Sequence, residues 1–185
     1  MGKLILITGG SRSGKSDFAL KLGNSLSGPR RFIATSPILD AEMAERVQRH
    51  RQRREGGGWD TLEEMLDLEK AIAASVGHRA LLIDCLTLWV NNLLWEAEKR
   101  FFHTLSEDEM AEYAHRLCDT CRGFAGVVIA VTNEVGMGIV PETAAARRFR
   151  DLAGRCNTVM AAAADEVWFC ISGIAVRIKP PGGIA

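Results

Sequence analysis

The sequence predicts an α/β fold in which helices cover both faces of a mostly parallel sheet. Short runs rich in isoleucine, valine and leucine recur along the chain, and they are continuously apolar, as expected of strands buried on both faces. Longer segments with helical spacing separate them, and such alternation is typical of a parallel sheet. Only Ser172 and Gly173 join the last two runs, which predicts a tight hairpin and an antiparallel C-terminal edge.

Six strands and six helices are expected, with one or two helices between most consecutive strands. The strands are residues 4–8, 32–35, 80–85, 127–132, 166–171 and 174–178. The helices are residues 14–25, 40–54, 62–74, 87–102, 106–124 and 141–164. Ser106 followed by Glu109 forms a capping box, and Pro141 suits a first helical turn. A length of 185 residues suits one core, so we expect a single domain over residues 1–185.

Composition argues against several classes of protein. Because 23 basic residues balance 23 acidic ones, no net positive field is available to hold nucleic acid, which is not an expected partner. No apolar run approaches the ~18 residues of a membrane span and no signal peptide is recognisable, so the expected location is cytoplasmic. The five scattered cysteines do not resemble a disulfide framework, and Cys118 and Cys121 lack the second pair that a zinc site needs.

A phosphate-binding pattern follows the first predicted strand. Residues 9–16 match G-x-x-x-x-G-K-[ST] and open the first helix, which is the context that a P-loop requires. In such a loop backbone N–H groups surround the phosphates, Lys15 reaches the β and γ oxygens, and the Ser16 hydroxyl ligates Mg²⁺ directly. Arg12 either contacts the triphosphate or is solvated. The expected nucleotide-binding residues of the loop are Gly9, Gly10, Ser11, Arg12, Ser13, Gly14, Lys15 and Ser16.

Asp84 stands at the end of the third predicted strand. P-loop enzymes place an acid near the metal at the end of another buried strand. Asp84 is therefore a candidate to hold the Mg²⁺ shell or to accept a proton from a substrate hydroxyl, the alternative being a strand-end cap. Active sites of open α/β sheets form at the carboxyl ends of strands, which favours a functional role.

His50 shares one face of the predicted helix 40–54 with Met43 and Val47. Arginines surround it at positions 46, 49, 51, 53 and 54. Their charge disfavours an imidazolium and favours a neutral, nucleophilic imidazole. From the residues alone, however, a histidine ending a solvated basic helix is the preferred interpretation.

Several segments in order resemble the bifunctional adenosylcobinamide kinase and adenosylcobinamide-phosphate guanylyltransferase family of cobalamin biosynthesis. They are residues 7–16 (ITGGSRSGKS), 32–36 (FIATS), 42–50 (EMAERVQRH), 82–87 (LIDCLT), 131–142 (VTNEVGMGIVPE) and 161–168 (AAAADEVW), and they span nearly the whole chain. The resemblance implies a RecA-like P-loop fold and two reactions. ATP or GTP phosphorylates the aminopropanol hydroxyl of adenosylcobinamide, and GMP from GTP is then transferred to that phosphate, giving adenosylcobinamide-GDP.

The resemblance also implies roles for residues. His50 is the implied nucleophile: a neutral imidazole attacks the α-phosphorus of GTP, pyrophosphate leaves, and the guanylylated histidine passes GMP onward. Lys15 and Asp84 complete the catalytic set, Mg²⁺ is the cofactor, and a corrinoid is the small-molecule partner. Nucleotide contacts outside the loop are implied at Ala34, Thr35, Ser36, Arg51, Gln52, Arg53, Arg54, Glu63 and Asp84.

Some relatives carry glutamate where Asp84 stands, which leaves its role as metal ligand or base undecided. Others carry histidine at Arg49, so here His50 is the single histidine of its helix. The turn at residues 133–138 either lines the substrate side of the site or is a glycine-rich connection. The rival functions are a P-loop small-molecule kinase without guanylyl transfer and a RecA-like motor or regulatory NTPase.

The family is trimeric, and one sequence feature agrees with a homotrimer. The helix after Asp84 is apolar around much of its girth, more than one core face requires. A subunit interface would explain the surplus, and deep burial within one chain is the alternative. The residues concerned are Leu86, Leu88, Trp89, Val90, Leu93 and Leu94.

Overall fold

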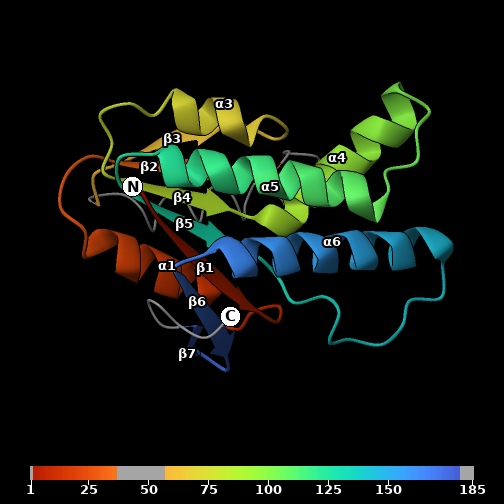
Figure 1. The fold of residues 1–185 in the computed structure, drawn as a ribbon. Coiled ribbons are helices and arrows are strands. Elements are labelled where there is room, and N and C mark those ends of the chain that lie inside the picture. The colour runs from red at the N-terminus through yellow and green to blue at the C-terminus, as the bar shows by residue number, and fades with distance from the viewer. Residues whose placement is uncertain (1, 37–56, 180–185) are drawn as a thin grey trace, which may run out of the picture.

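A seven-stranded sheet with the order β3-β2-β4-β5-β1-β6-β7 forms the centre of the fold (Figure 1). The computed structural model describes residues 2–36 and 57–179. The strands are β1 (Lys3–Gly9), β2 (Arg30–Ala34), β3 (Trp59–Glu63), β4 (Ala80–Asp84), β5 (Val127–Val131), β6 (Glu166–Ile171) and β7 (Ile174–Lys179). All neighbours pair in parallel except β6 and β7. The predicted fold class is confirmed, including its antiparallel C-terminal edge.

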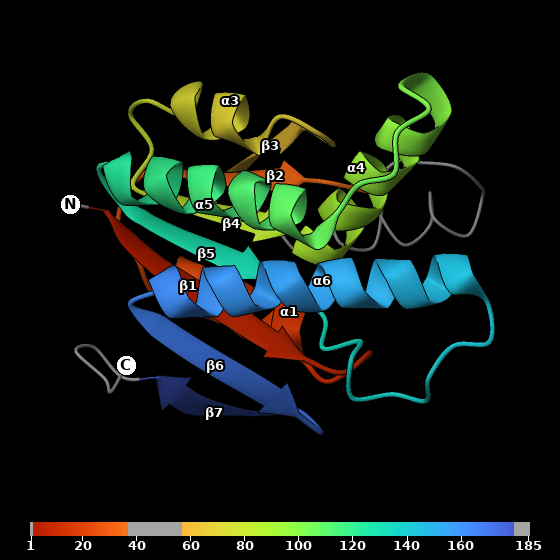
Figure 2. The same cartoon turned by 45° about the vertical axis from the view of Figure 1, so that its right-hand side comes forward.

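Helices cover both faces of this sheet (Figure 2). On one face lies α1 (Lys15–Asn24), and on the other lie α3 (Leu68–Ala73), α4 (Leu86–Arg100), α5 (Glu107–Gly123) and α6 (Ala144–Ala163). Alternate strand residues divide between the two layers: Leu4 and Leu6 of β1 join the core with α5 and α6, whereas Ile5 and Ile7 join the core with α1. Burial on both faces explains why the strands are continuously apolar.

Between β2 and α3 the structure corrects the sequence prediction. Residues 59–63 form β3 and pair with β2, and α3 begins only at Leu68, where the Asp67 carboxylate accepts a hydrogen bond from the Lys70 backbone N–H at 2.9 Å. The predicted helix 62–74 was therefore wrong in its first turns. Pairing with β2 and the cap at Asp67 override the helical pattern. As a result, Glu63 lies at the carboxyl end of a strand.

The last helix also starts later than predicted, at Ala144. Thr143 is its N-cap and accepts a hydrogen bond from the Ala146 N–H at 3.2 Å. The Arg147 guanidinium donates to the carbonyls of Pro141 and Glu142, at 3.0 and 2.6 Å. These two carbonyls lie before the helix and are bound by a side chain of its first turn. In contrast, the capping box predicted at the start of α5 is confirmed.

The apolar residues around α4 are mostly buried within one chain. Five of the six apolar residues singled out in the sequence are buried in the core shared with α5 and α6, namely Leu86, Trp89, Val90, Leu93 and Leu94. The interpretation of these residues as a subunit interface is therefore wrong, and deep burial is confirmed. Exposed aromatic side chains occur instead near the end of the helix and just after it, at Trp95, Phe101 and Phe102.

All five cysteines are free and buried. Cys118 and Cys121 both lie on the inner face of α5, as predicted for small apolar residues. Burial raises the pKa of the Cys118 thiol to about 11 and that of the Cys156 thiol to about 12, so both stay protonated at neutral pH. Within the described ranges, every helix is too short or too polar to cross a bilayer.

Candidate active site at the carboxyl ends of the strands

The strand register brings predicted site residues from separate segments into one row. Glu63 ends β3 and pairs with Ala34 at the end of β2, which pairs with Asp84 at the end of β4. Asp84 pairs in turn with Val131 of β5, and Val131 pairs with Ile7 of β1. Because neighbouring strands lie about 4.8 Å apart, this row runs across the sheet to the strand that carries the phosphate loop.

Asp84 lies on the sheet face that α1 covers. Leu82, two residues earlier, packs in the core with α1, and Ile83 packs on the opposite face, so alternation along β4 directs Asp84 toward the α1 side. Lys15 and Ser16 are the first residues of α1. The predicted acid and the predicted phosphate-loop side chains therefore share one face of the sheet.

Two glycines of the phosphate loop are required by close contacts. At Gly9 φ is +147°, and an added Cβ would lie 2.2 Å from the carbonyl oxygen of Cys170 in β6. At Gly14 φ is +93°, and an added Cβ would lie 3.1 Å from the Cα of Gly173. The Gly173 N–H donates to the Ser13 carbonyl at 3.0 Å. The turn of the β6–β7 hairpin thus packs against the loop and fixes its path.

Lys15 places its charge inside the loop. Its side chain is buried, and its ammonium donates to the Gly10 carbonyl at 2.6 Å and to Ser13 Oγ at 3.4 Å. No heavy atom of the described residues lies within 4 Å of a Cβ added at Gly10, so that side of the loop is open. An ammonium beside an open curl of backbone fits a phosphate group.

The donor chemistry also fits magnesium. The Ser16 hydroxyl and the Asp84 carboxylate are oxygen donors on the same face of the sheet, and Mg²⁺ prefers such ligands. A site with one or two protein ligands is usual for this ion, because phosphate oxygens and water complete its octahedron.

Thr35 joins the ends of β2 and β4. Its hydroxyl accepts from the Cys85 N–H at 2.7 Å and donates to the Cys85 carbonyl at 2.8 Å, and Asn92 of α4 donates to the Thr35 carbonyl at 2.8 Å. The side chain of Thr35 is fully buried, whereas Ala34 and Ser36 are half-buried. Thr35 thus holds the site together through its hydroxyl.

A buried ring of hydrogen bonds, which the sequence did not predict, fixes the peptide just after β5. The Asn133 N–H donates to Thr87 Oγ1 at 2.8 Å, and the hydroxyls of Thr87 and Thr132 lie 3.1 Å apart. Thr132 donates to Asn157 Oδ1 at 2.7 Å, and Asn157 Nδ2 donates back to the Asn133 carbonyl at 3.0 Å. Since the Thr132 proton points to Asn157, Thr87 is the donor to Thr132, and the ring closes. No sequence signal indicated Asn157, which lies mid-helix in α6.

Some predicted site residues cannot be placed. His50, Arg51, Gln52, Arg53 and Arg54 lie outside the described residues, so their roles stay predictions. The side chain of Arg12 is exposed and its φ is +55°, which leaves open whether it contacts a triphosphate.

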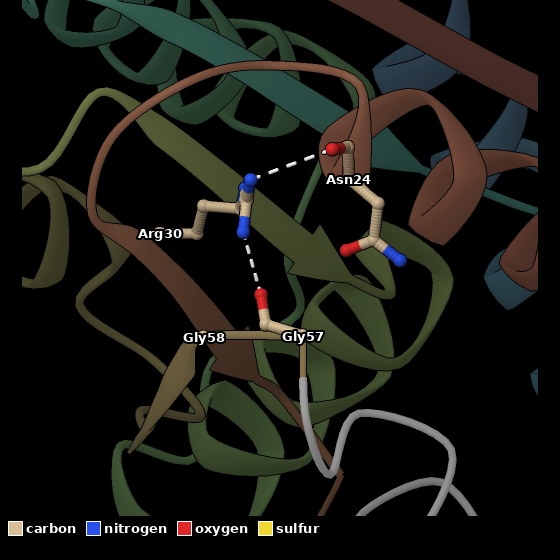
Figure 3. A pocket seen from close by; sticks show the side chains of 4 residues that line it. All are labelled: Asn24, Arg30, Gly57 and Gly58. Atoms are coloured by element: carbon tan, nitrogen blue, oxygen red, sulfur yellow. Dashed lines mark hydrogen bonds between the residues drawn. The ribbon is translucent and has the colours of Figure 1, made fainter.

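A hollow at the opposite, amino edge of the sheet carries different chemistry (Figure 3). It is lined by Asn24, Arg30, Gly57 and Gly58. The Arg30 guanidinium donates to the carbonyls of Leu26 at 2.7 and 3.1 Å, of Gly57 at 2.6 Å and of Asn24 at 3.4 Å. All three of its nitrogens are thereby used to join chain segments.

Comparison with known proteins identifies the family of the chain. The family model described as cobinamide kinase / cobinamide phosphate guanyltransferase matches residues 5–178. The bifunctional adenosylcobalamin biosynthesis protein CobU of Escherichia coli K12 is 44% identical over 182 residues, which cover 95% of this chain and 99% of that protein. CobU of Salmonella typhimurium LT2 gives the same figures, and CobP of Pseudomonas aeruginosa PAO1 is 36% identical over 177 residues, 94% of this chain and 96% of that protein. The chain therefore belongs to the cobinamide kinase / cobinamide phosphate guanyltransferase family.

Proposed function

We propose that one domain, residues 1–185, carries out both reactions of its family at the carboxyl edge of the sheet. The observation that carries the proposal is the row of Glu63, Ala34 and Asp84 on the same edge as the phosphate loop. Adenosylcobinamide is first phosphorylated by ATP or GTP, and GMP from GTP is then transferred to adenosylcobinamide phosphate.

For the kinase reaction, residues 9–16 hold the triphosphate. Backbone N–H groups of the loop bind the β and γ phosphates, and Lys15 turns from the Gly10 carbonyl to the phosphate oxygens, where it offsets the charge that develops on transfer. Ser16 and Asp84 are the residues that hold Mg²⁺, which neutralises phosphate charge when bound. Ala34, Thr35, Ser36 and Glu63 border the nucleotide.

For the transferase reaction, His50 is the nucleophile. A neutral imidazole nitrogen bonds to the α-phosphorus of GTP, the bond from that phosphorus to the α,β-bridging oxygen breaks, and pyrophosphate leaves with the electron pair. The phosphate of the corrinoid then attacks the same phosphorus and frees the imidazole. In the sequence, His50 falls between β2 and β3, and β2 ends at Ala34 on the edge where the phosphate loop stands. Arg51, Gln52, Arg53 and Arg54 follow it in the sequence, and the arginines among them supply positive charge for binding GTP.

Labelling with GTP carrying a radioactive α-phosphate tests this assignment. We expect acid-labile, alkali-stable label on the wild-type protein, and His50→Ala should abolish it. His115→Ala, which changes an exposed histidine of α5, is the control and should label normally. If the wild-type protein phosphorylates cobinamide but takes up no label, the enzyme is a kinase only and the transferase proposal is wrong. If the His50→Ala variant still takes up label, another residue is the nucleophile.

We further propose that the enzyme is a cytoplasmic homotrimer. The resemblance implies the trimer, and the exposed Trp95, Phe101 and Phe102 near the end of α4 offer apolar surface for subunit contact. The free thiols and the nucleotide substrates suit the cytoplasm. Light scattering should give a mass three times that of the 20.2 kDa chain, and Phe101→Ser with Phe102→Ser should lower it. A monomeric wild-type protein would overturn the trimer.

A further inference from the structure

We infer that Glu134 is the general base of the kinase reaction, accepting the proton from the hydroxyl of cobinamide that is phosphorylated. The inference deepens the proposed function and rests on it. It gives one acid the role of base and leaves Asp84 to the metal.

Glu134 stands directly beside the phosphate loop. Its backbone N–H donates to the carbonyl of Gly9 at 3.0 Å, which fixes its main chain against the first residue of the loop. It follows β5, the strand that lies between β1 and β4 in the sheet. Glu134 therefore follows the strand that lies between β1, which carries the phosphate loop, and β4, which ends at Asp84.

The carboxylate of Glu134 differs from the other acids at this edge. Glu64 accepts hydrogen bonds from the N–H groups of Leu66 and Asp67, and Glu63 and Asp84 also interact with other groups of the protein. The half-buried carboxylate of Glu134 makes no hydrogen bond or ion pair with any residue in the described ranges. An acid held close to the phosphate loop, with neither oxygen bound by a described residue, is suited to accept a proton from a substrate.

The buried ring of Thr87, Thr132 and Asn157 acts as the positioning device for this acid. It binds both the N–H and the carbonyl of Asn133, the residue before Glu134. The ring side chains are all at most 8% exposed, and each donates and accepts within the ring. A fixed peptide on one side and the bond to Gly9 on the other leave little backbone freedom at Glu134, as a positioned catalytic group requires.

The chemistry balances without a further reactant. The hydroxyl oxygen of the aminopropanol arm bonds to the γ-phosphorus, and the bond from that phosphorus to the β,γ-bridging oxygen breaks, so that the nucleoside diphosphate leaves with the electron pair. The hydroxyl proton moves to the Glu134 carboxylate, which later releases it to water. Asn133 and Glu134 precede a turn that contains Gly136 and Gly138.

Steady-state kinetics of Glu134→Gln test the inference. With cobinamide and ATP, kcat should fall about 100-fold, the usual contribution of a general base, while the KM for ATP stays within about threefold of wild type. Glu142→Gln is the matched control, since it removes an exposed glutamate from the other end of the same connection, and it should keep wild-type kcat. Wild-type protein that does not phosphorylate cobinamide would refute the proposed function itself.

If wild type is active and Glu134→Gln retains more than about a third of its kcat, Glu134 is not the base. A large rise in the KM for ATP, with kcat preserved, would also overturn the inference by making Glu134 a nucleotide contact. The ring is tested separately. Thr132→Val should lower kcat about tenfold without changing the KM for ATP, and Thr132→Ser, which keeps the hydroxyl, should restore it. Equal kcat in the two variants would show that the ring does not position Glu134 for catalysis.

Discussion

The two edges of the sheet use charged side chains in opposite ways. At the amino edge, every guanidinium nitrogen of Arg30 donates a hydrogen bond to a carbonyl of its own chain, at Asn24, Leu26 or Gly57. Figure 3 shows the bonds to Asn24 and Gly57. At the carboxyl edge, the ammonium of Lys15 donates to two groups of the phosphate loop, the Gly10 carbonyl and Ser13 Oγ. The carboxylate of Glu134 has no partner among the described residues.

This difference distinguishes charged groups that stabilise the fold from charged groups that can bind a ligand. A charged group whose hydrogen-bonding capacity is filled by its own chain stabilises the fold but has nothing left to offer a ligand. A charged group held in place by its backbone, with its side chain available, can exchange its contacts for those of a substrate. The hollow beside Arg30 is therefore a structural feature, and the proposed chemistry lies at the carboxyl edge.

The largest effect is expected at the carboxyl edge, from Lys15→Ala. Removing the ammonium deletes a charge contact that strengthens in the transition state, so the kcat/KM for cobinamide phosphorylation should fall by about 10²–10³. The melting temperature of Lys15→Ala should stay close to that of wild type. Lys21→Ala, on an exposed position of the same helix, is the control for general charge effects. Retained kinase activity would contradict the role given to the loop.

The next effect concerns the contact between the loop and the β6–β7 hairpin. Gly14→Ala places a Cβ at φ +93° and 3.1 Å from Gly173, so we expect a loss of about 1–3 kcal/mol of unfolding free energy in urea. Gly10→Ala is the matched control, because its Cβ meets open space, and its stability should stay close to wild type. Equal stability of the two variants would show that the hairpin does not constrain the loop.

At the amino edge, Arg30→Met should affect stability alone. Its loss removes the hydrogen bonds to Leu26 and Gly57 and should cost about 1–3 kcal/mol in urea unfolding, with kcat for both reactions unchanged. Arg100→Met, which removes a side chain that is 71% exposed and bonded to Glu96, is the control and should change stability by less than about 0.5 kcal/mol. A fall in kcat at normal stability would give the hollow a catalytic role.

The smallest effect depends on pH and concerns the capping box of α5. Hydrogen bonds from the Ser106 side chain and backbone lower the pKa of the exposed Glu109 carboxyl from 4.5 to about 2. A lowered folded-state pKa means that the ionised carboxylate stabilises the fold fully above about pH 4.5 and loses this contribution as pH falls toward 2. The difference in melting temperature between wild type and Glu109→Gln should shrink over that range. A difference that is constant with pH would exclude the charge as its cause.

Local signals predicted most of the fold. Continuous apolar runs located six of the seven strands, and the Ser106 cap located the start of α5. The sequence did not reveal β3, because Trp59–Glu63 is a short strand with half-buried and exposed residues whose pairing with β2 is not local. The same lack of local information explains why the sequence left two explanations for the apolar residues around α4, a subunit interface or deep burial, whereas neighbouring helices of the same chain enclose most of them.

By itself the sequence determined the phosphate loop, because the requirements for its glycines, its lysine and its position between a strand and a helix are satisfied by adjacent residues. Tertiary structure alone decided which other groups join that loop. The register of the sheet sets Glu63, Ala34 and Asp84 side by side, and the ring around Asn133 brings together Thr87, Thr132 and Asn157 from different elements. Both arrangements depend on how distant segments pair and pack, and that pairing is fixed only when the whole core forms.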